Sequence, residues 1–468
     1  MQHKRSRKVF KELSRCQFDV EFLKYLFAIR LKIKNYQNFY VVKIILLLLI
    51  LFFSLNLKSQ DLKKSIQDNS HRIFINVNDT SYDDLLYLGE VVKNSKVVML
   101  GEQEHGDGTT FIAKTRIVKF LHEKLGFNVL AFESDFISLN MSWSQVINNK
   151  LPVRNALYSN IYPVWTKCLQ CDDLFKYIES ESKKTTILNV AGFDNQLTGV
   201  TAYLNLKNLL LDSIAALDSA FYKVAGDNFS TQIDSIKNLL SGKIIIKALE
   251  LERLYKSFIS NLSILEDFFT QKYPASNRYL IFIKSIKSFY LQNFYSLQNK
   301  DFESGQERDS QMALNLTWLI QNQYPNDKII VWAANSHIIK NYQADINKKY
   351  NSPFSMGQIL TKKSEFSQKV YVIGFTGYTG KSKRAFGNQK VINISKPKKN
   401  SFEEWINETK KENVFIDFVN VRKTFKNEKF YMNFKNWIDE KSDWLNSYDG
   451  IIYINIISPC ETKATPLR

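Results

Sequence analysis

Short apolar runs alternate along this chain with segments in which apolar residues recur at helical spacing. Several of the runs are rich in valine, isoleucine or phenylalanine and end abruptly in polar residues, as strands buried on both faces do. The runs that predict strands are residues 97–100, 128–132, 186–191, 328–333, 370–375, 414–418 and 450–456. Strands that alternate with helices indicate an α/β fold with a largely parallel central sheet covered by helices.

The segments between these runs predict the helices. Residues 112–125 carry apolar side chains at helical spacing directly after the first strand, and residues 304–323 repeat this pattern further along the chain. Residues 200–298 carry leucine and isoleucine at helical spacing with almost no glycine. We therefore expect an inserted helical region at about 200–300.

Polar side chains follow four of the predicted strands. The first strand is followed by Glu102 and His105, and the others by Glu133, Asp194 and His337. Ligands bind at the carboxyl ends of the strands in open α/β sheets, so we expect these side chains to line one cleft, with the two histidines facing each other. The alternative is that the first group is only a solvated loop with a helix cap.

Two histidines and two glutamates in one cleft suit general acid–base catalysis. A neutral imidazole can take a proton from water, while a carboxylate fixes its tautomer and stabilises the imidazolium. The same residue types can also bind a divalent metal, which leaves a metal-dependent enzyme as an alternative.

The N-terminal part of the chain predicts export. Residues 44–59 contain one strongly apolar run, from Ile44 to Leu57, which is short for a membrane span and suits a signal-peptide core. The basic extension of residues 1–43 is longer than an ordinary signal-peptide start, so a short membrane anchor is the alternative. Translation from a later start is a third interpretation. We expect residues 60–468 to form the exported domain, in the periplasm or cell envelope.

Composition excludes two classes of protein. With 44% hydrophobic and 14% aromatic residues, the 468-residue chain is not a disordered protein. Its net charge is +18, of which the first 43 residues contribute +8, and the rest is spread over the remaining chain. Because no nucleic-acid motif accompanies this diffuse excess of lysine, we do not expect a nucleic-acid partner.

Two further motifs, and the absence of a third, bear on the function only by argument against other classes of site. The segment from Gly374 to Ser382 resembles a phosphate-binding loop but misses the required glycine spacing, and we expect an exposed turn there. No G-x-S-x-G motif is present, which argues against a serine hydrolase of the nucleophile-elbow type. Cys168 and Cys171 form an isolated C-x-x-C pair, for which we expect a short-range disulfide or two inert thiols.

Five short motifs, in order, resemble the erythromycin esterase-like proteins. They are the G-E-x-x-H-G loop (Gly101, Glu102, His105, Gly106), the strand ending in Phe132 and Glu133, the G-F-D segment (Gly192, Phe193, Asp194), the R-D-x-x-M-A-x-N helix (Arg308, Asp309, Met312, Ala313, Asn315) and the W-A-x-N-x-H element (Trp332, Ala333, Asn335, His337). Their order and rough spacing agree with this family from about residue 91 to residue 375.

The resemblance implies a carboxylic ester hydrolase that uses no metal or other cofactor and acts on a small ester or lactone, with a role in the response to an antibiotic. His105 would be the general base on water, Glu102 and Glu133 would align it, and His337 would polarise or protonate the ester. Arg116 would stabilise the oxyanion. The other residues that the resemblance places at the substrate are Asp194, Arg308, Asp309 and Asn335.

One position departs from the family pattern. Ala334 stands where many macrolide-cleaving members carry a second histidine, which argues against macrolide cleavage. The same departure leaves a non-catalytic binding protein on the same fold as an alternative, because fold alone does not determine function.

Overall fold

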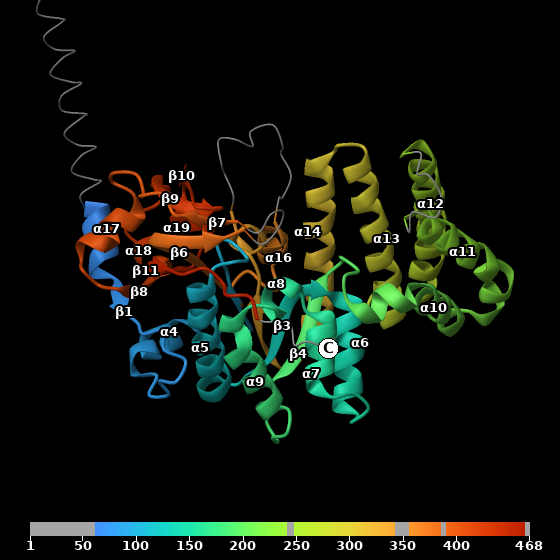
Figure 1. The fold of residues 1–468 in the computed structure, drawn as a ribbon, viewed down its shortest axis with the longest axis horizontal. Coiled ribbons are helices and arrows are strands. Elements are labelled where there is room, and N and C mark those ends of the chain that lie inside the picture. The colour runs from blue at the N-terminus through green and yellow to red at the C-terminus, as the bar shows by residue number, and fades with distance from the viewer. Residues whose placement is uncertain (1–60, 241–247, 342–354, 385–389, 464–468) are drawn as a thin grey trace, which may run out of the picture. The chain divides into compact units, whose positions relative to one another are not determined.

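The computed structural model describes residues 61–240, 248–341, 355–384 and 390–463 (Figure 1). The chain divides into two units, residues 1–64 and residues 65–468, and the second contains all elements described below. The basic extension and the apolar run from Ile44 to Leu57 lie outside the described residues. Among the residues that are described, none of the helices combines the length and the apolar character that crossing a membrane requires.

A mixed sheet of nine strands lies at the centre of the described part of the second unit, in the order β1-β8-β11-β6-β2-β5-β3-β4, with β7 beside β6. The six strands from β11 to β4 run parallel, while β8 and β1 at one edge, and β7, are antiparallel to their neighbours. The strands are β1 (Ser70–Arg72), β2 (Val97–Leu100), β3 (Phe127–Asp135), β4 (Asn189–Asp194), β5 (Lys328–Trp332), β6 (Val370–Lys383), β7 (Val391–Asn393), β8 (Asn413–Asp417) and β11 (Gly450–Ile457). A separate pair is formed by β9 (Phe430–Lys435) and β10 (Ile438–Ser442).

The largely parallel sheet predicted from the sequence is confirmed. All seven predicted strands are present, and the first, β2, has the predicted bounds and is fully buried. Sequence analysis missed β1, β7, β9 and β10. Two of these have only three residues, and β10 (Ile438–Ser442) contains mostly charged or polar residues, so none of these three shows the apolar run of a central strand.

The exposed turn expected near Gly374 is wrong, because β6 continues through this segment to Lys383. Its backbone pairs with the parallel strand β11 as far as Gly380. Ser382 is buried and donates a hydrogen bond to Asp107. The glycines here serve close packing against β11, since a Cβ at Gly380 would lie 2.0 Å from the carbonyl oxygen of Ile457.

Helices connect the parallel strands, and the predicted helical insertion follows β4. It consists of α10 (Val200–Leu217), α11 (Ser219–Leu240), α12 (Ala248–Lys272) and α13 (Arg278–Leu297), which lead into α14 (Asp301–Trp318). In Figure 1 these helices stand together beside the β4 edge of the sheet. The helix predicted at residues 304–323 is present as α14 followed by the π-helical turn η3 (Leu319–Gln323).

The remaining helices are short or lie close to the sheet. Of these, α5 packs against β3 and β11, and α6 packs against β3 and β4. They are η1 (Asp83–Leu85), α4 (Leu86–Val92), α5 (Gly108–Leu125), α6 (Phe136–Ile147), α7 (Val153–Asn160), α8 (Pro163–Thr166), η2 (Leu169–Cys171), α9 (Asp172–Glu181), α15 (Asn335–Ile338), α16 (Met356–Lys362), α17 (Phe402–Glu408), α18 (Phe418–Val421) and α19 (Trp444–Ser447).

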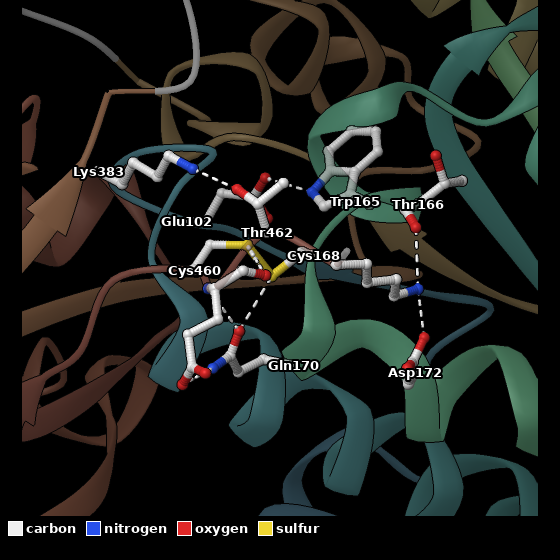
Figure 2. The surroundings of a disulfide bond; sticks show 11 residues. Glu102, Trp165, Thr166, Cys168, Gln170, Asp172, Lys383, Cys460 and Thr462 are labelled. Atoms are coloured by element: carbon white, nitrogen blue, oxygen red, sulfur yellow. Dashed lines mark hydrogen bonds and ion pairs between the residues drawn. A yellow bond between two sulfur atoms is a disulfide. The ribbon is translucent and has the colours of Figure 1, made fainter. Parts of the chain in front are cut away.

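A disulfide joins Cys168 to Cys460, although the two residues are 292 positions apart (Figure 2). The expected short-range disulfide is therefore wrong, and Cys171 is a buried free thiol. Residues 458–463, which we call the C-terminal strap, run beside the segment around Cys168. A backbone hydrogen bond of 2.8 Å from Leu169 to Glu461 fixes this contact. Cysteine spacing alone cannot reveal a pairing that tertiary structure creates.

Candidate active site

Four neighbouring parallel strands bring the predicted cluster together. The strands β2, β5, β3 and β4 are adjacent, and their carboxyl ends lead into Glu102, His337, Glu133 and Asp194 respectively. The expected convergence of these side chains is present in the structure. The two histidines meet at a single carboxylate oxygen, Oε1 of Glu133, which lies 4.0 Å from Nε2 of His105 and 3.3 Å from Nε2 of His337.

His105 is held by Glu102, which precedes it in the same loop. The imidazole Nδ1 lies 2.8 Å from Oε1 of Glu102, and that carboxylate is completely buried. A carboxylate accepts hydrogen bonds, so it favours the tautomer with the proton on Nδ1. In the neutral ring Nε2 is then the proton acceptor.

Two residues that sequence analysis missed complete the surroundings of Glu102. The buried Lys114 on α5 donates a hydrogen bond to Oε2. The indole N–H of Trp165 donates one of 3.2 Å to Oε1, and Figure 2 draws this contact between Trp165 and Glu102. The ring of Trp165 also stands edge-on to the imidazole of His105, with 5.5 Å between their centroids. Lys114 lies on the buried face of its helix, where a charged lysine without a partner would cost free energy. A lysine at a position that the helical spacing predicts to be buried was the signal from which this residue could have been found.

Glu133 carries a negative charge in a buried, positively charged environment. Its Oε1 accepts a hydrogen bond of 2.8 Å from Arg308, and its Oε2 accepts one of 2.9 Å from the backbone N–H of Ala334. Burial alone would raise the pKa of Glu133, but the positive charges of His337, Arg308 and His105 lower it to about 2. Glu133 is therefore ionised throughout the neutral range.

Arg308 joins two of the strand ends. Its guanidinium binds Asp194 through two hydrogen bonds, of 3.1 Å and 2.6 Å, and reaches Glu133 with the same Nη2 atom. Asp194 is fully buried, so its charge is compensated mainly by this fork. Asp194 was predicted to bind substrate, and in the structure it positions Arg308 instead.

Asp309, the neighbour of Arg308 on α14, orients the second histidine. Nδ1 of His337 lies 2.9 Å and 3.1 Å from the two oxygens of Asp309, and the backbone N–H of Met356 donates to the same carboxylate. Burial alone would lower the pKa of His337, but Asp309 and Glu133 raise it above 6.5. The two carboxylates therefore stabilise the protonated form of His337, whose Nε2 lies 3.3 Å from Oε1 of Glu133.

The pKa of His105 is also raised above 6.5. Burial alone would lower it, but the hydrogen bond to Glu102 and the charges of Glu133, Glu102 and Glu104 outweigh that effect. Since His105, Glu133 and His337 are so close, their titrations are coupled, and a measured pKa belongs to the cluster.

A cavity of about 220 Å³ opens onto His105 and Glu133, and His337 lies behind Glu133 outside its lining. Its lining includes His105, Glu133 and Arg308, together with aromatic and polar side chains that suit an organic ligand. These further residues are Tyr162, Val164, Trp165 and Gln196. The hydroxyl of Tyr162 donates to the side chain of Gln196 across this lining.

Two predicted substrate-binding residues point elsewhere. Arg116 is buried and binds Asp84 and Asp79 in the segment before α4, so the expectation that it stabilises an oxyanion is wrong. The side chain of Asn335 is buried as well. It pairs with both the N–H and the carbonyl of Phe375 on β6 and thereby fixes the loop after β5.

In the described ranges, no three side chains of histidine, cysteine, aspartate or glutamate are arranged so that they could hold a metal ion together. The carboxylate oxygens of the two glutamates in the site already accept hydrogen bonds from other groups. Lys114 and Trp165 occupy oxygens of Glu102, and Arg308 and Ala334 occupy those of Glu133.

Comparisons with known proteins agree with this architecture. The family model described as erythromycin esterase matches residues 122–456, a range that contains Glu133, Arg308 and His337 but begins after His105. A Bacillus subtilis (strain 168) protein named "Putative hydrolase YbfO" is 27% identical over 408 residues, covering 82% of this chain and 89% of its own. Erythromycin esterase type II of Escherichia coli is 24% identical over 429 residues, covering 85% and 98%.

A solved structure is similar in fold. It is a mutant of the erythromycin esterase EreC in its open conformation, with a TM-score of 0.59 and 16% identity, covering 84% of this chain and 98% of that chain. This likeness supports an α/β fold with a helical insertion.

Proposed function

Because this chain belongs to the erythromycin esterase family, we propose that it is a hydrolase that cleaves a small ester or lactone by general-base activation of water. The single observation that carries the proposal is the pair of histidines on either side of Oε1 of Glu133, each held through Nδ1 by its own carboxylate. Such a pair supplies one proton acceptor and one proton donor beside the same carboxylate.

His105 acts as the base in this proposal. With its proton on Nδ1 and bound to Glu102, the neutral ring takes a proton from water through Nε2, and the resulting hydroxide attacks the ester carbonyl. The imidazolium that forms lies between Glu102 and Glu133, and both negative charges stabilise it. Lys114 keeps Glu102 in place.

His337 acts on the other side of the reacting carbonyl. In its protonated form it polarises the carbonyl oxygen while hydroxide adds to the carbonyl carbon. When the C–O ester bond of the tetrahedral intermediate breaks, it gives its proton to the departing alkoxide oxygen, which leaves as the alcohol, while Asp309 holds the ring. Arg308 lies 3.3 Å from Nε2 of His337 and adds positive charge where negative charge develops. In this proposal Arg308 therefore stabilises the oxyanion, the role that sequence analysis had assigned to Arg116.

A panel of esters and lactones, including macrolides, tests the proposal. The purified full-length chain is expected to hydrolyse at least one member at the same rate with and without a chelator. Loss of activity on chelation, restored by a divalent metal, would identify the metal-dependent alternative. Binding of a panel member without turnover would favour the non-catalytic alternative.

We also propose that the folded domain is exported. The apolar run from Ile44 to Leu57 and the disulfide between Cys168 and Cys460 support this location, because disulfides persist in oxidising compartments. A C-terminal reporter that is active only outside the cytoplasm is expected to be active. Activity of a matched cytoplasmic reporter instead would contradict export, and N-terminal sequencing would distinguish cleavage near Gln60 from anchoring.

A further inference from the structure

A second cavity adjoins the one that contains the catalytic groups. It has a volume of about 260 Å³, and its lining shares His105, Tyr162 and Val164 with the first cavity. One substrate can therefore extend from one cavity into the other past the imidazole of His105. Nothing in the proposed mechanism uses the second cavity.

The lining of the second cavity is positively charged. It contains Lys167, Lys383 and Arg384, and none of its described lining residues is a carboxylate. Glu104 forms an ion pair of 2.7 Å with Arg384 and offsets one of these charges. The remaining lining residues are neutral apart from His105: Gly106, Tyr162, Pro163, Val164, Cys460 and Thr462. An excess of two positive charges therefore lies beside the catalytic histidine.

The walls that carry these charges are fixed by the fold. A Cβ at Gly106 would lie 1.8 Å from the carbonyl oxygen of Lys383, so only glycine lets the catalytic loop approach the end of β6 this closely. The backbone N–H of Cys460 in the C-terminal strap donates a hydrogen bond of 2.8 Å to the carbonyl of Gly106. The catalytic loop, the end of β6 and the strap thus form one continuous wall.

Lys383 is held in position on this wall. Its ammonium group donates a hydrogen bond of 2.6 Å to the hydroxyl of Thr462 in the strap, and Figure 2 shows the side chain extended toward that residue. The disulfide anchors the strap to Cys168, the residue after Lys167. The hydroxyl is uncharged, so this hydrogen bond does not offset the positive charge of Lys383.

We propose that the second cavity binds an anionic group, a carboxylate or a phosphate, carried by the substrate at the end remote from the ester bond. The inference rests on the proposed hydrolase function. The apolar side chains of Pro163 and Val164 suit a short hydrocarbon linker, and the lysines suit the charge at its end. The preferred substrate is then a half-ester or a similar acidic ester.

The kinetic test compares two matched esters on the full-length enzyme, mono-p-nitrophenyl glutarate and its neutral methyl ester. The ratio of their kcat/KM values is expected to favour the acid by about tenfold or more, as charge-assisted hydrogen bonds do. Replacing Lys167→Met and Lys383→Met together is expected to lower this ratio by about tenfold. Lys150→Met, an exposed lysine outside both cavities, is the control and should leave the ratio unchanged.

A binding measurement separates this inference from the proposed function. Titration calorimetry with glutarate and, separately, with methyl phosphate is expected to detect binding of at least one anion to the wild type and to His105→Asn, and to show which anion is preferred. Binding should be lost in the double lysine variant. If no ester is cleaved but the lysines bind the anion, the proposed function fails and the anionic site stands. A ratio near one, or anion binding that survives in the double variant, would overturn the inference.

Discussion

Replacing His105 with asparagine is expected to lower kcat/KM by about 10²–10⁴-fold, the usual effect of losing a general base. Asparagine approximates the shape of the imidazole and can still donate a hydrogen bond to Glu102, which lies 2.8 Å from Nδ1. It offers no basic nitrogen at the position of Nε2. The loss should therefore appear in the chemical step, and steady-state kinetics with the best ester from the panel measures it.

Folding should be little affected in this variant. His105 lies in a loop with 15% of its side chain exposed, and its ring fills little of the core. A matched control is His122→Asn on α5, where the histidine bonds to Tyr177 and lines neither cavity. Activity in His105→Asn within tenfold of the wild type would show that another group is the base.

Replacing Arg308 with methionine is expected to lower both stability and activity. The change leaves the buried carboxylates of Glu133 and Asp194 without their shared cation, and breaking a buried ion pair costs about 3–5 kcal/mol in the free energy of unfolding. Loss of positive charge beside His337 is expected to lower kcat by about 10²–10³-fold. Urea denaturation and kinetics measure the two effects.

The stability loss should depend on pH in a defined direction. In the wild type the pKa of Glu133 is lowered from 4.5 to about 2, so its contribution to stability is fully present above pH 4.5 and is lost as the pH falls toward 2. Arg308 is one cause of that lowering. The difference in the free energy of unfolding between wild type and Arg308→Met should therefore be largest above pH 4.5 and become smaller as the pH falls below that value.

Arg116→Met is the matched control for Arg308→Met. Arg116 is also buried against two aspartates, but it lies outside both cavities. Its loss should lower the free energy of unfolding while the remaining folded protein keeps its kcat. Equal loss of kcat in the two variants would contradict the role of Arg308 beside the reacting ester.

Much of the fold could be predicted from the sequence because its central strands are buried on both faces. Such strands appear as continuous apolar runs, and β2 has the predicted bounds. The convergence of Glu102, Glu133 and His337 followed from one rule, since their strands are neighbours in a parallel sheet. Short or polar edge strands carry no such signal.

The partners of each side chain could not be predicted in the same way. Arg116 follows the catalytic loop in sequence, yet the helical turn directs it to Asp84, away from the cavity. Lys114, two positions earlier, faces Glu102. Spacing identifies a helix and its buried face, but which buried polar groups meet depends on segments distant in sequence. The pairing of Cys168 with Cys460 has the same origin.

The pH dependence of kcat/KM tests the central claim most directly, namely that a histidine with a raised pKa must lose its proton to act as the base. The claim predicts that kcat/KM falls on the acid side with an apparent pKa above 6.5, belonging to the coupled cluster. In Glu133→Gln this limb should move to lower pH, because one of the charges that raise the pKa of His105 is gone, and the rate should also fall. A kcat/KM that stays constant from pH 8 to pH 5, or an acid limb that Glu133→Gln does not move, would contradict the account.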